Sequence, residues 1–217
     1  MNEIDRQLTI KRYSERLKKF GTSDEALGWT RNNNKTRFEV LTKEWQNELD
    51  NSTILDYGCG FADYYGFLLT MNILPSKYFG LDINSDLLAI AKERYNEIEV
   101  LVGDVDSLKG IENVDFSFIS GVFNHKLENQ NEKEFIKDTI EKVFSKCDKG
   151  LAVNFLSDKV EYQTEHNHNS NPGEILEFCF SLTNNIVLRN DYMPFEFTVF
   201  LRKNIPLNRE KLIFERQ

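Results

Sequence analysis

Residues 53–60 read Thr-Ile-Leu-Asp-Tyr-Gly-Cys-Gly, an apolar run that ends in an aspartate and two closely spaced glycines. Asp56 falls at the end of the run. Gly58 and Gly60 allow a tight turn in which the backbone can come close to a ligand, because neither residue carries a Cβ. A buried strand, a glycine turn and the start of a helix form the nucleotide-binding corner of a doubly wound sheet. The spacing therefore predicts a ligand site at this turn.

The charges around the turn indicate which kind of ligand it would accept. The dinucleotide fingerprint requires a third glycine, and Asp63 stands at that place. A pyrophosphate needs free backbone N–H groups and the positive end of a helix, so acids on both sides of the turn disfavour it. S-adenosylmethionine carries a sulfonium, an ammonium group and no phosphate, and it fits this environment better. The alternative is an ordinary strand-to-helix turn whose glycines serve geometry alone.

Two more strand ends carry an acid. Residues 78–82 read as a strand that ends on Asp82, which lies 26 residues after Asp56. This offset is a little longer than the roughly 20 residues expected for a ribose-binding acid. The two carboxylate oxygens of Asp82 can accept hydrogen bonds from both ribose hydroxyls. Residues 98–103 read as a third strand, followed by Asp104. Each acid alone would also serve as a helix N-cap or turn residue, but three in succession favour a ligand site.

The remaining pattern alternates helices and strands, which is typical of a parallel sheet with helices on both faces. We expect helices over 4–20, 35–49, 63–69, 87–95, 131–146 and 173–182, and strands over 53–56, 78–82, 98–103, 114–119, 150–156, 185–189 and 195–201. The fold class is thus α/β. It is a Rossmann-like, seven-stranded, mostly parallel sheet with an antiparallel last strand, plus an N-terminal helical cap over 1–50 that precedes the ligand-binding domain over 51–217.

Size and composition narrow the class of protein. The chain has 217 residues and a formal net charge of −8, which disfavours nucleic acid as a partner because phosphate neutralisation needs a basic face. No run approaches the roughly 18 apolar residues of a membrane span, and the charged start of the chain lacks an apolar signal-peptide core. Three cysteines without metal-ligand spacing favour reduced thiols. We therefore expect a cytoplasmic protein with neither a membrane nor a nucleic-acid partner.

The motifs Asp-Tyr-Gly-Cys-Gly (56–60), Gly-Leu-Asp (80–82) and Gly-Asp (103–104), with the terminal strand pair, resemble the core of the class I S-adenosylmethionine-dependent methyltransferases over about 50–203. The segments 26–29 and 191–199 resemble small bacterial methyltransferases of surface-polysaccharide and capsule modification. The resemblance implies S-adenosylmethionine as the cofactor and a small-molecule acceptor. It implies the following cofactor-binding residues: Arg37 on the cofactor carboxylate, Asp56, Gly58, Gly60, Asp82 on the ribose, Asp104 on the adenine amino group, Ile83 and Val105 on the adenine faces, and Ser120.

The acceptor chemistry rests on fewer residues. His125 follows the fourth strand directly and can take a proton near neutral pH, so it is the candidate catalytic base, if a base is needed. The substrate-binding candidates are Asn124, Tyr162, His166 and Tyr192. For each of these residues a plain loop or packing role stays open, and His166 with His168 and Glu165 stays open as a metal site, although we expect none.

Two other functions remain open. A nicotinamide-dependent oxidoreductase uses a similar sheet, but the missing third glycine weighs against it. A non-catalytic scaffold would keep the fold without the chemistry, and the intact acids of the three strand ends weigh against that reading. The signature of amide-nitrogen methylation is absent after the fourth strand, where Ser-Gly-Val-Phe (120–123) stands. A small-molecule O-methyltransferase is the leading prediction.

Overall fold

A computed structural model describes residues 1–29, 33–204, 207–208 and 213–214. Its main feature is a seven-stranded sheet built from β1 (Thr53–Tyr57), β2 (Lys77–Asp82), β3 (Glu99–Val102), β4 (Val114–Ile119), β5 (Cys147–Leu156), β6 (Ile186–Arg189) and β7 (Glu196–Arg202). The strand order is β3-β2-β1-β4-β5-β7-β6, and β7 runs antiparallel to both of its neighbours. The predicted fold class is therefore confirmed.

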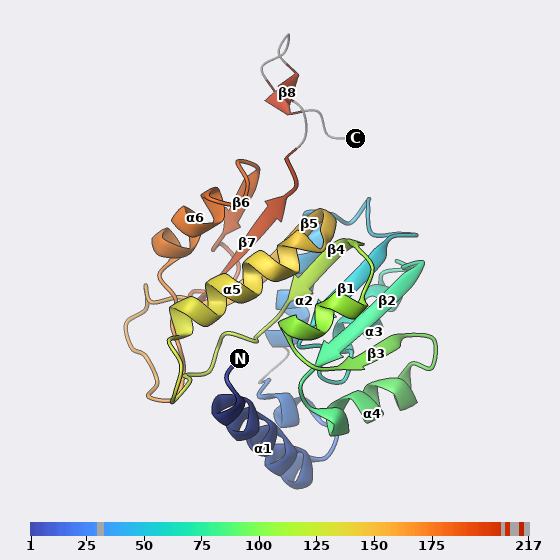
Figure 1. Cartoon of the computed structure of the whole chain (residues 1–217), viewed down its shortest axis with the longest axis vertical. Coiled ribbons are helices and arrows are strands. Elements are labelled where there is room, and N and C mark those ends of the chain that lie inside the picture. Colours follow the sequence, from blue (N-terminus) through green and yellow to red (C-terminus); the bar gives the residue numbers. More distant parts are fainter. Residues whose placement is uncertain (30–32, 205–206, 209–212, 215–217) are drawn as a thin grey trace.

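The helices are α1 (Glu3–Phe20), α2 (Asn33–Lys43), α3 (Asp63–Thr70), α4 (Ser85–Arg94), α5 (Glu132–Ser145) and α6 (Pro172–Phe180), with short 3-10 helices η1 (Asp24–Leu27) and η2 (Val105–Gly110). The two faces of the sheet carry separate hydrophobic clusters. Side chains from α5 and α6 pack on one face, and side chains from α2 and α3 pack on the other. Figure 1 shows α5 and α6 in front of the sheet and α1 across its lower end.

The helix expected over 35–49 is shorter than predicted. It ends at Lys43, and the chain then turns through i→i−3 hydrogen bonds from Trp45 to Thr42 and from Glu48 to Trp45. These turns place the Trp45 ring in the core, with its centroid 5.0 Å from the ring of Phe116. Burying a large aromatic side chain outweighs continuing the helix. The region before β1 therefore packs on the sheet itself, and the division of the chain at residue 50 stays a prediction.

Two further strands follow the sheet, where the sequence suggested none. β8 (Leu207–Asn208) and β9 (Ile213–Phe214) pair antiparallel as a separate two-stranded unit. The closing helix and strands of the domain lie within a few residues of their expected bounds, as is usual for element ends. No helix of the described residues is long and apolar enough to cross a membrane.

Candidate cofactor and acceptor site

A cavity of about 850 Å³ lies where the parallel strands β1, β2 and β4 end. This is the edge at which doubly wound sheets bind ligands. The cavity collects most of the residues predicted from the sequence: Arg37, Asp56, Gly58, Gly60, Asp82, Ile83, Asp104, Ser120, Asn124, His125 and Tyr162. We call the part formed by Asp56, Gly58, Gly60, Asp82 and Asp104 the cofactor half, and the part formed by Ser120, Asn124, His125 and the loop 157–170 the acceptor half.

The glycine turn of the cofactor half is fastened to the next strand. Gly58 has φ 78°, a left-handed conformation that favours glycine, and a Cβ there would stand 2.3 Å from Val122 Cγ2. The Gly58 N–H donates to the Leu81 carbonyl oxygen at 2.7 Å, and the Gly60 N–H donates to Asp82 Oδ2 at 3.0 Å. These N–H groups are the ones a pyrophosphate would need. Their use inside the protein agrees with a ligand that carries no phosphate.

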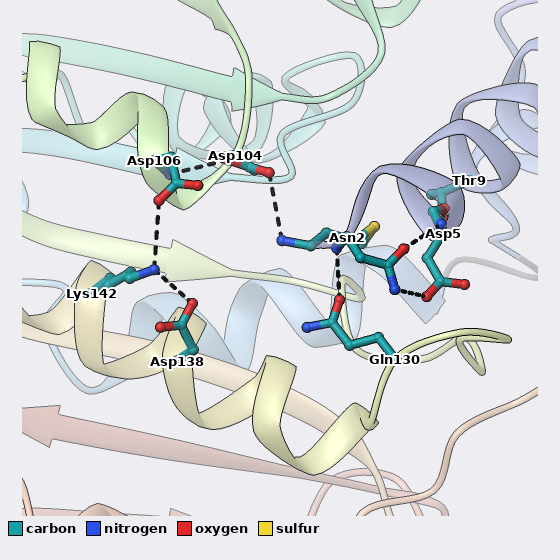
Figure 2. A network of polar contacts seen from close by, with 9 residues as sticks. Asn2, Asp5, Thr9, Asp104, Asp106, Gln130, Asp138 and Lys142 are labelled. Carbon is teal, nitrogen blue, oxygen red and sulfur yellow. Dashed lines mark hydrogen bonds and ion pairs between the residues drawn. The ribbon is translucent and has the colours of Figure 1, made fainter.

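Asp82 and Asp104 are held in place by backbone hydrogen bonds. Asp82 Oδ1 accepts from the Asn84 N–H at 2.9 Å, so each of its oxygens has one protein donor and room for another. Burial raises the pKa of Asp82, and these N–H groups oppose that shift. Asp104 caps η2 by accepting from the Asp106 N–H at 3.1 Å, and its other oxygen lies 3.6 Å from the amine of Met1 (Figure 2). Asp104 therefore caps η2 and lines the cavity at the same time.

Asp56 is the most unusual acid of the site. Its side chain is buried and accepts a hydrogen bond from the Tyr78 hydroxyl at 2.6 Å. Loss of solvation raises the pKa of Asp56 to about 7, and the nearby Asp82 carboxylate adds to the shift, while the Tyr78 bond opposes it. A cation in the cavity would favour the ionised carboxylate. The acid is therefore suited to respond to the charge of its ligand.

Helix α1 covers the cavity and is tied to the loop after β4. Asn2 Oδ1 caps the helix by accepting from the Asp5 N–H, and the Asn2 N–H donates to Gln130 Oε1 at 2.8 Å (Figure 2). The buried Asp5 carboxylate accepts from the Glu128 N–H at 2.8 Å. Thr9 and Tyr13 of this helix line the cavity. The N-terminal helix thus forms part of the wall of the site.

The acceptor half is lined by neutral polar groups that the protein leaves unpaired. Ser120 Oγ, Asn124 Oδ1 and His125 Nδ1 are buried and find no hydrogen-bond partner within the described structure. Backbone hydrogen bonds join the loop after β4 to the loop 157–170, from the His168 N–H to the Asn124 carbonyl oxygen at 3.1 Å and from Lys126 to His166 at 3.2 Å. Buried polar groups in proteins are nearly always paired, so these atoms are candidates for ligand contacts.

His125 is uncharged at neutral pH. Burial lowers the pKa of His125 to about 4, and the positive charges of Arg12 and Arg16 contribute. Its ring meets the ring of Tyr13 edge to face, with centroids 6.1 Å apart. Its unpaired Nδ1 can accept a hydrogen bond, but a pKa of about 4 makes the imidazole a weak base at neutral pH. The predicted role as a base stays a prediction.

Three predicted residues do not line the cavity. Val105 is buried in the hydrophobic cluster under α5, although its neighbour Asp104 reaches the site. The Tyr192 hydroxyl lies 2.8 Å from Thr198 Oγ1, and His166 is exposed in its loop. Tyr162 stands at the rim with 79% of its surface exposed. Within the described part of the chain, no group of three or more His, Cys, Asp or Glu residues could hold a metal ion.

Sequence reasoning missed the partners of Arg37. Two guanidinium nitrogens of Arg37 bond to the carboxylate of Glu196 on β7, Nε to Oε2 at 2.8 Å and Nη2 to Oε1. Asn154 on β5 donates to the same carboxylate at 3.1 Å. All three side chains are buried, and Arg37 and Glu196 line the cavity. The one signal in the sequence is an acid between two phenylalanines at the start of a largely apolar strand.

Comparisons with known proteins agree with this geometry. Residues 54–143 match the family model described as a methyltransferase domain. No curated protein matches the chain in sequence. Magnesium protoporphyrin IX methyltransferase from Synechocystis PCC 6803, solved with S-adenosylhomocysteine, is similar in structure, with a TM-score of 0.67 and 12% identity over 93% of this chain and 99% of that one.

Two further solved structures share the fold. An S-adenosylmethionine-dependent methyltransferase from Clostridium acetobutylicum has a TM-score of 0.60 and 11% identity over 88% of this chain and 98% of that one. DhpI, in complex with S-adenosylhomocysteine, has a TM-score of 0.64 and 11% identity over 92% of this chain and 97% of that one. The fold is therefore that of S-adenosylmethionine-dependent methyltransferases. With the matched domain, it supports the predicted enzyme class and cofactor.

Proposed function

We propose that this protein transfers a methyl group from S-adenosylmethionine to an oxygen of a small polar molecule. The observation that carries the proposal is the cofactor half, where a glycine turn whose N–H groups are already bonded meets the buried Asp56 and Asp104 and the half-buried Asp82 in one cavity. Such a site suits a cationic, phosphate-free nucleoside and disfavours a dinucleotide. Asp82 would bind the ribose, Asp104 the adenine amino group, and Ile83 an adenine face.

The acceptor would bind between the loop after β4 and the loop 157–170. The sulfonium of the cofactor is an excellent leaving group, so the protein mainly has to align the acceptor oxygen and exclude water. Asn124 would orient that oxygen and His125 would take its proton, while Ser120, at the start of the same loop, stays a predicted cofactor contact. Tyr162 at the rim would contact the far end of the acceptor, while Tyr192 and His166 lie off the cavity.

The biological acceptor is proposed on the resemblance of segments 26–29 and 191–199 to capsule-modifying methyltransferases. It would be a precursor of a capsule or another surface polysaccharide, either a sugar or a phosphoramidate. All three cysteines are free, which supports a reaction in the reducing cytoplasm. The alternatives are a scaffold without activity and a nicotinamide-dependent oxidoreductase.

Calorimetry with S-adenosylhomocysteine and NAD separates these functions. Binding of S-adenosylhomocysteine alone is the expected result and would justify a screen of capsule precursors. Binding of NAD alone would contradict the proposal. Binding of neither would favour the scaffold.

A further inference from the structure

The ion pair between Arg37 and Glu196 links the segment before β1 to the antiparallel strand β7 inside the cavity. Both side chains are buried, with 4% and 1% of their surfaces exposed. Buried ion pairs are weak evidence for stability, because well-packed apolar residues of similar size often do as well. Stability alone therefore does not explain why a charged pair lies at this position. The hydrogen-bond donors that Glu196 leaves unpaired suggest a role in ligand binding.

Glu196 occupies two of the three guanidinium nitrogens and leaves the third one unpaired. Nη1 of Arg37 is buried and has no hydrogen-bond partner among the residues that the structure describes. The guanidinium stacks on the Trp29 ring, with Cζ 4.3 Å from the ring centroid, and Trp29 Nε1 is likewise buried and unpaired. Both residues line the cavity. Two unpaired donors on stacked residues can bind an anionic oxygen, and the methyltransferase resemblance implies a carboxylate as the partner of Arg37.

The orientation of this subsite depends on more than the ion pair. Asn154 Nδ2 donates to Glu196 Oε2, and Asn154 Oδ1 accepts from the Gly121 N–H at 2.8 Å. Gly121 has φ 77° and lies against the edge of the Trp29 ring, where an added Cβ would stand 3.0 Å from Trp29 Cη2. One buried network thus fixes Arg37, Trp29 and the loop that begins the acceptor half.

We infer that Glu196 is a positioning residue, which directs Nη1 of Arg37, together with Trp29 Nε1, at the α-carboxylate of the cofactor. This inference rests on the proposed methyltransferase function. The amino-acid end of S-adenosylmethionine carries the single carboxylate of that cofactor. Glu196 also neutralises the guanidinium, so the subsite binds one carboxylate without attracting other anions strongly.

The test compares two ligands that differ at the amino-acid end. S-adenosylhomocysteine carries the carboxylate, and 5′-methylthioadenosine lacks it. By calorimetry, Glu196→Gln should lower the affinity for S-adenosylhomocysteine about tenfold and leave the affinity for 5′-methylthioadenosine within about twofold. Trp29→Phe keeps an aromatic ring for stacking, removes Nε1 and should cause a smaller loss for S-adenosylhomocysteine alone. In an Arg37→Met background, Glu196→Gln should cause no further change in the ratio of the two affinities.

Glu48→Gln is the matched control. It breaks a second pair between an arginine and a glutamate, in which Arg202 Nη2 lies 2.7 Å from Glu48 Oε1, and neither residue lines the cavity. That variant should lose stability without changing the ratio of the two affinities. If Glu196→Gln does not fold, the apolar pair Arg37→Met with Glu196→Leu takes its place, and it should bind 5′-methylthioadenosine normally and lose the preference for S-adenosylhomocysteine.

The outcomes distinguish a failure of the positioning role from a failure of the methyltransferase function. Equal losses for both ligands in Glu196→Gln, or no loss for either, would overturn the positioning role while the methyltransferase function stands. A parent protein that binds neither ligand would overturn both. A selective loss for S-adenosylhomocysteine in Glu196→Gln, absent in Glu48→Gln, supports the inference.

Discussion

The cofactor half and the acceptor half of the cavity use their polar groups in opposite ways. In the cofactor half, Gly60, Asp82 and Asn84 are bonded to one another before any ligand arrives. In the acceptor half, Ser120, Asn124 and His125 keep buried atoms without partners in the described structure. The first half is preorganised by its own backbone. The second has polar atoms that a bound acceptor can pair, and specificity for an acceptor can arise there.

The largest effect is expected from Gly58→Ala in the cofactor half. The added methyl would stand 2.3 Å from Val122 Cγ2 on a left-handed backbone, so the turn or the Val122 side chain must shift. We expect a loss of about 1–3 kcal/mol in the free energy of unfolding, and loss of measurable S-adenosylhomocysteine binding. Urea unfolding and calorimetry measure the two effects. Gly110→Ala is the control, because a Cβ there meets nothing within 4 Å, and normal binding by Gly58→Ala would show that the turn is not part of the site.

The next effect belongs to the acceptor half alone. His125→Ala should slow turnover about 100-fold, the lower range for a general base, and leave the affinity for S-adenosylhomocysteine nearly unchanged. Since the pKa of His125 is about 4, its protonation should not change the rate between about pH 6 and about pH 8. Turnover measured with a found acceptor tests this expectation. Equal rates for parent and variant would remove His125 from the mechanism.

Asp82→Ala should produce a smaller loss, confined to the cofactor half. It removes the proposed ribose acceptor and also leaves the N–H groups of Gly60 and Asn84 without their bonds. We expect S-adenosylhomocysteine binding to weaken by about 1–3 kcal/mol. Asp86→Ala, in the first turn of α4 and outside the cavity, is the matched control. Unchanged affinity in a folded Asp82→Ala protein would contradict the ribose assignment.

The two halves also differ in how far the sequence predicts them. The strand ends carry Asp56, Asp82 and Asp104 at spacings that a parallel sheet brings to one edge, so local patterns suffice there. The pair of Arg37 with Glu196 joins positions 159 residues apart, and nothing local to either residue indicates the other. Three residues predicted to line the cavity do not line it: Val105, Tyr192 and His166. Whether such a residue reaches the cavity depends on the direction of its side chain at a strand end or in a loop. That choice is made by tertiary packing and is not encoded in spacing.

The smallest predicted effect is a pH dependence of cofactor binding that arises from Asp56. Its pKa of about 7 means that the carboxyl is largely protonated at about pH 6, and a cationic ligand must displace that proton. Affinity for S-adenosylmethionine should therefore rise a few-fold from about pH 6 to about pH 8, with release of a proton seen in calorimetry across buffers of different ionisation enthalpy.

Asp56→Asn should remove this pH dependence. The pH dependence of unfolding, measured without ligand, independently checks the direction of the Asp56 pKa shift. Because the folded pKa of Asp56 is raised above its unfolded value, its contribution to stability is complete below about pH 4 and is lost as pH rises through about 7. The variant should flatten that decline. A parent protein whose affinity for S-adenosylmethionine does not change with pH would show that Asp56 stays in one protonation state, and that the cofactor half recognises shape more than charge.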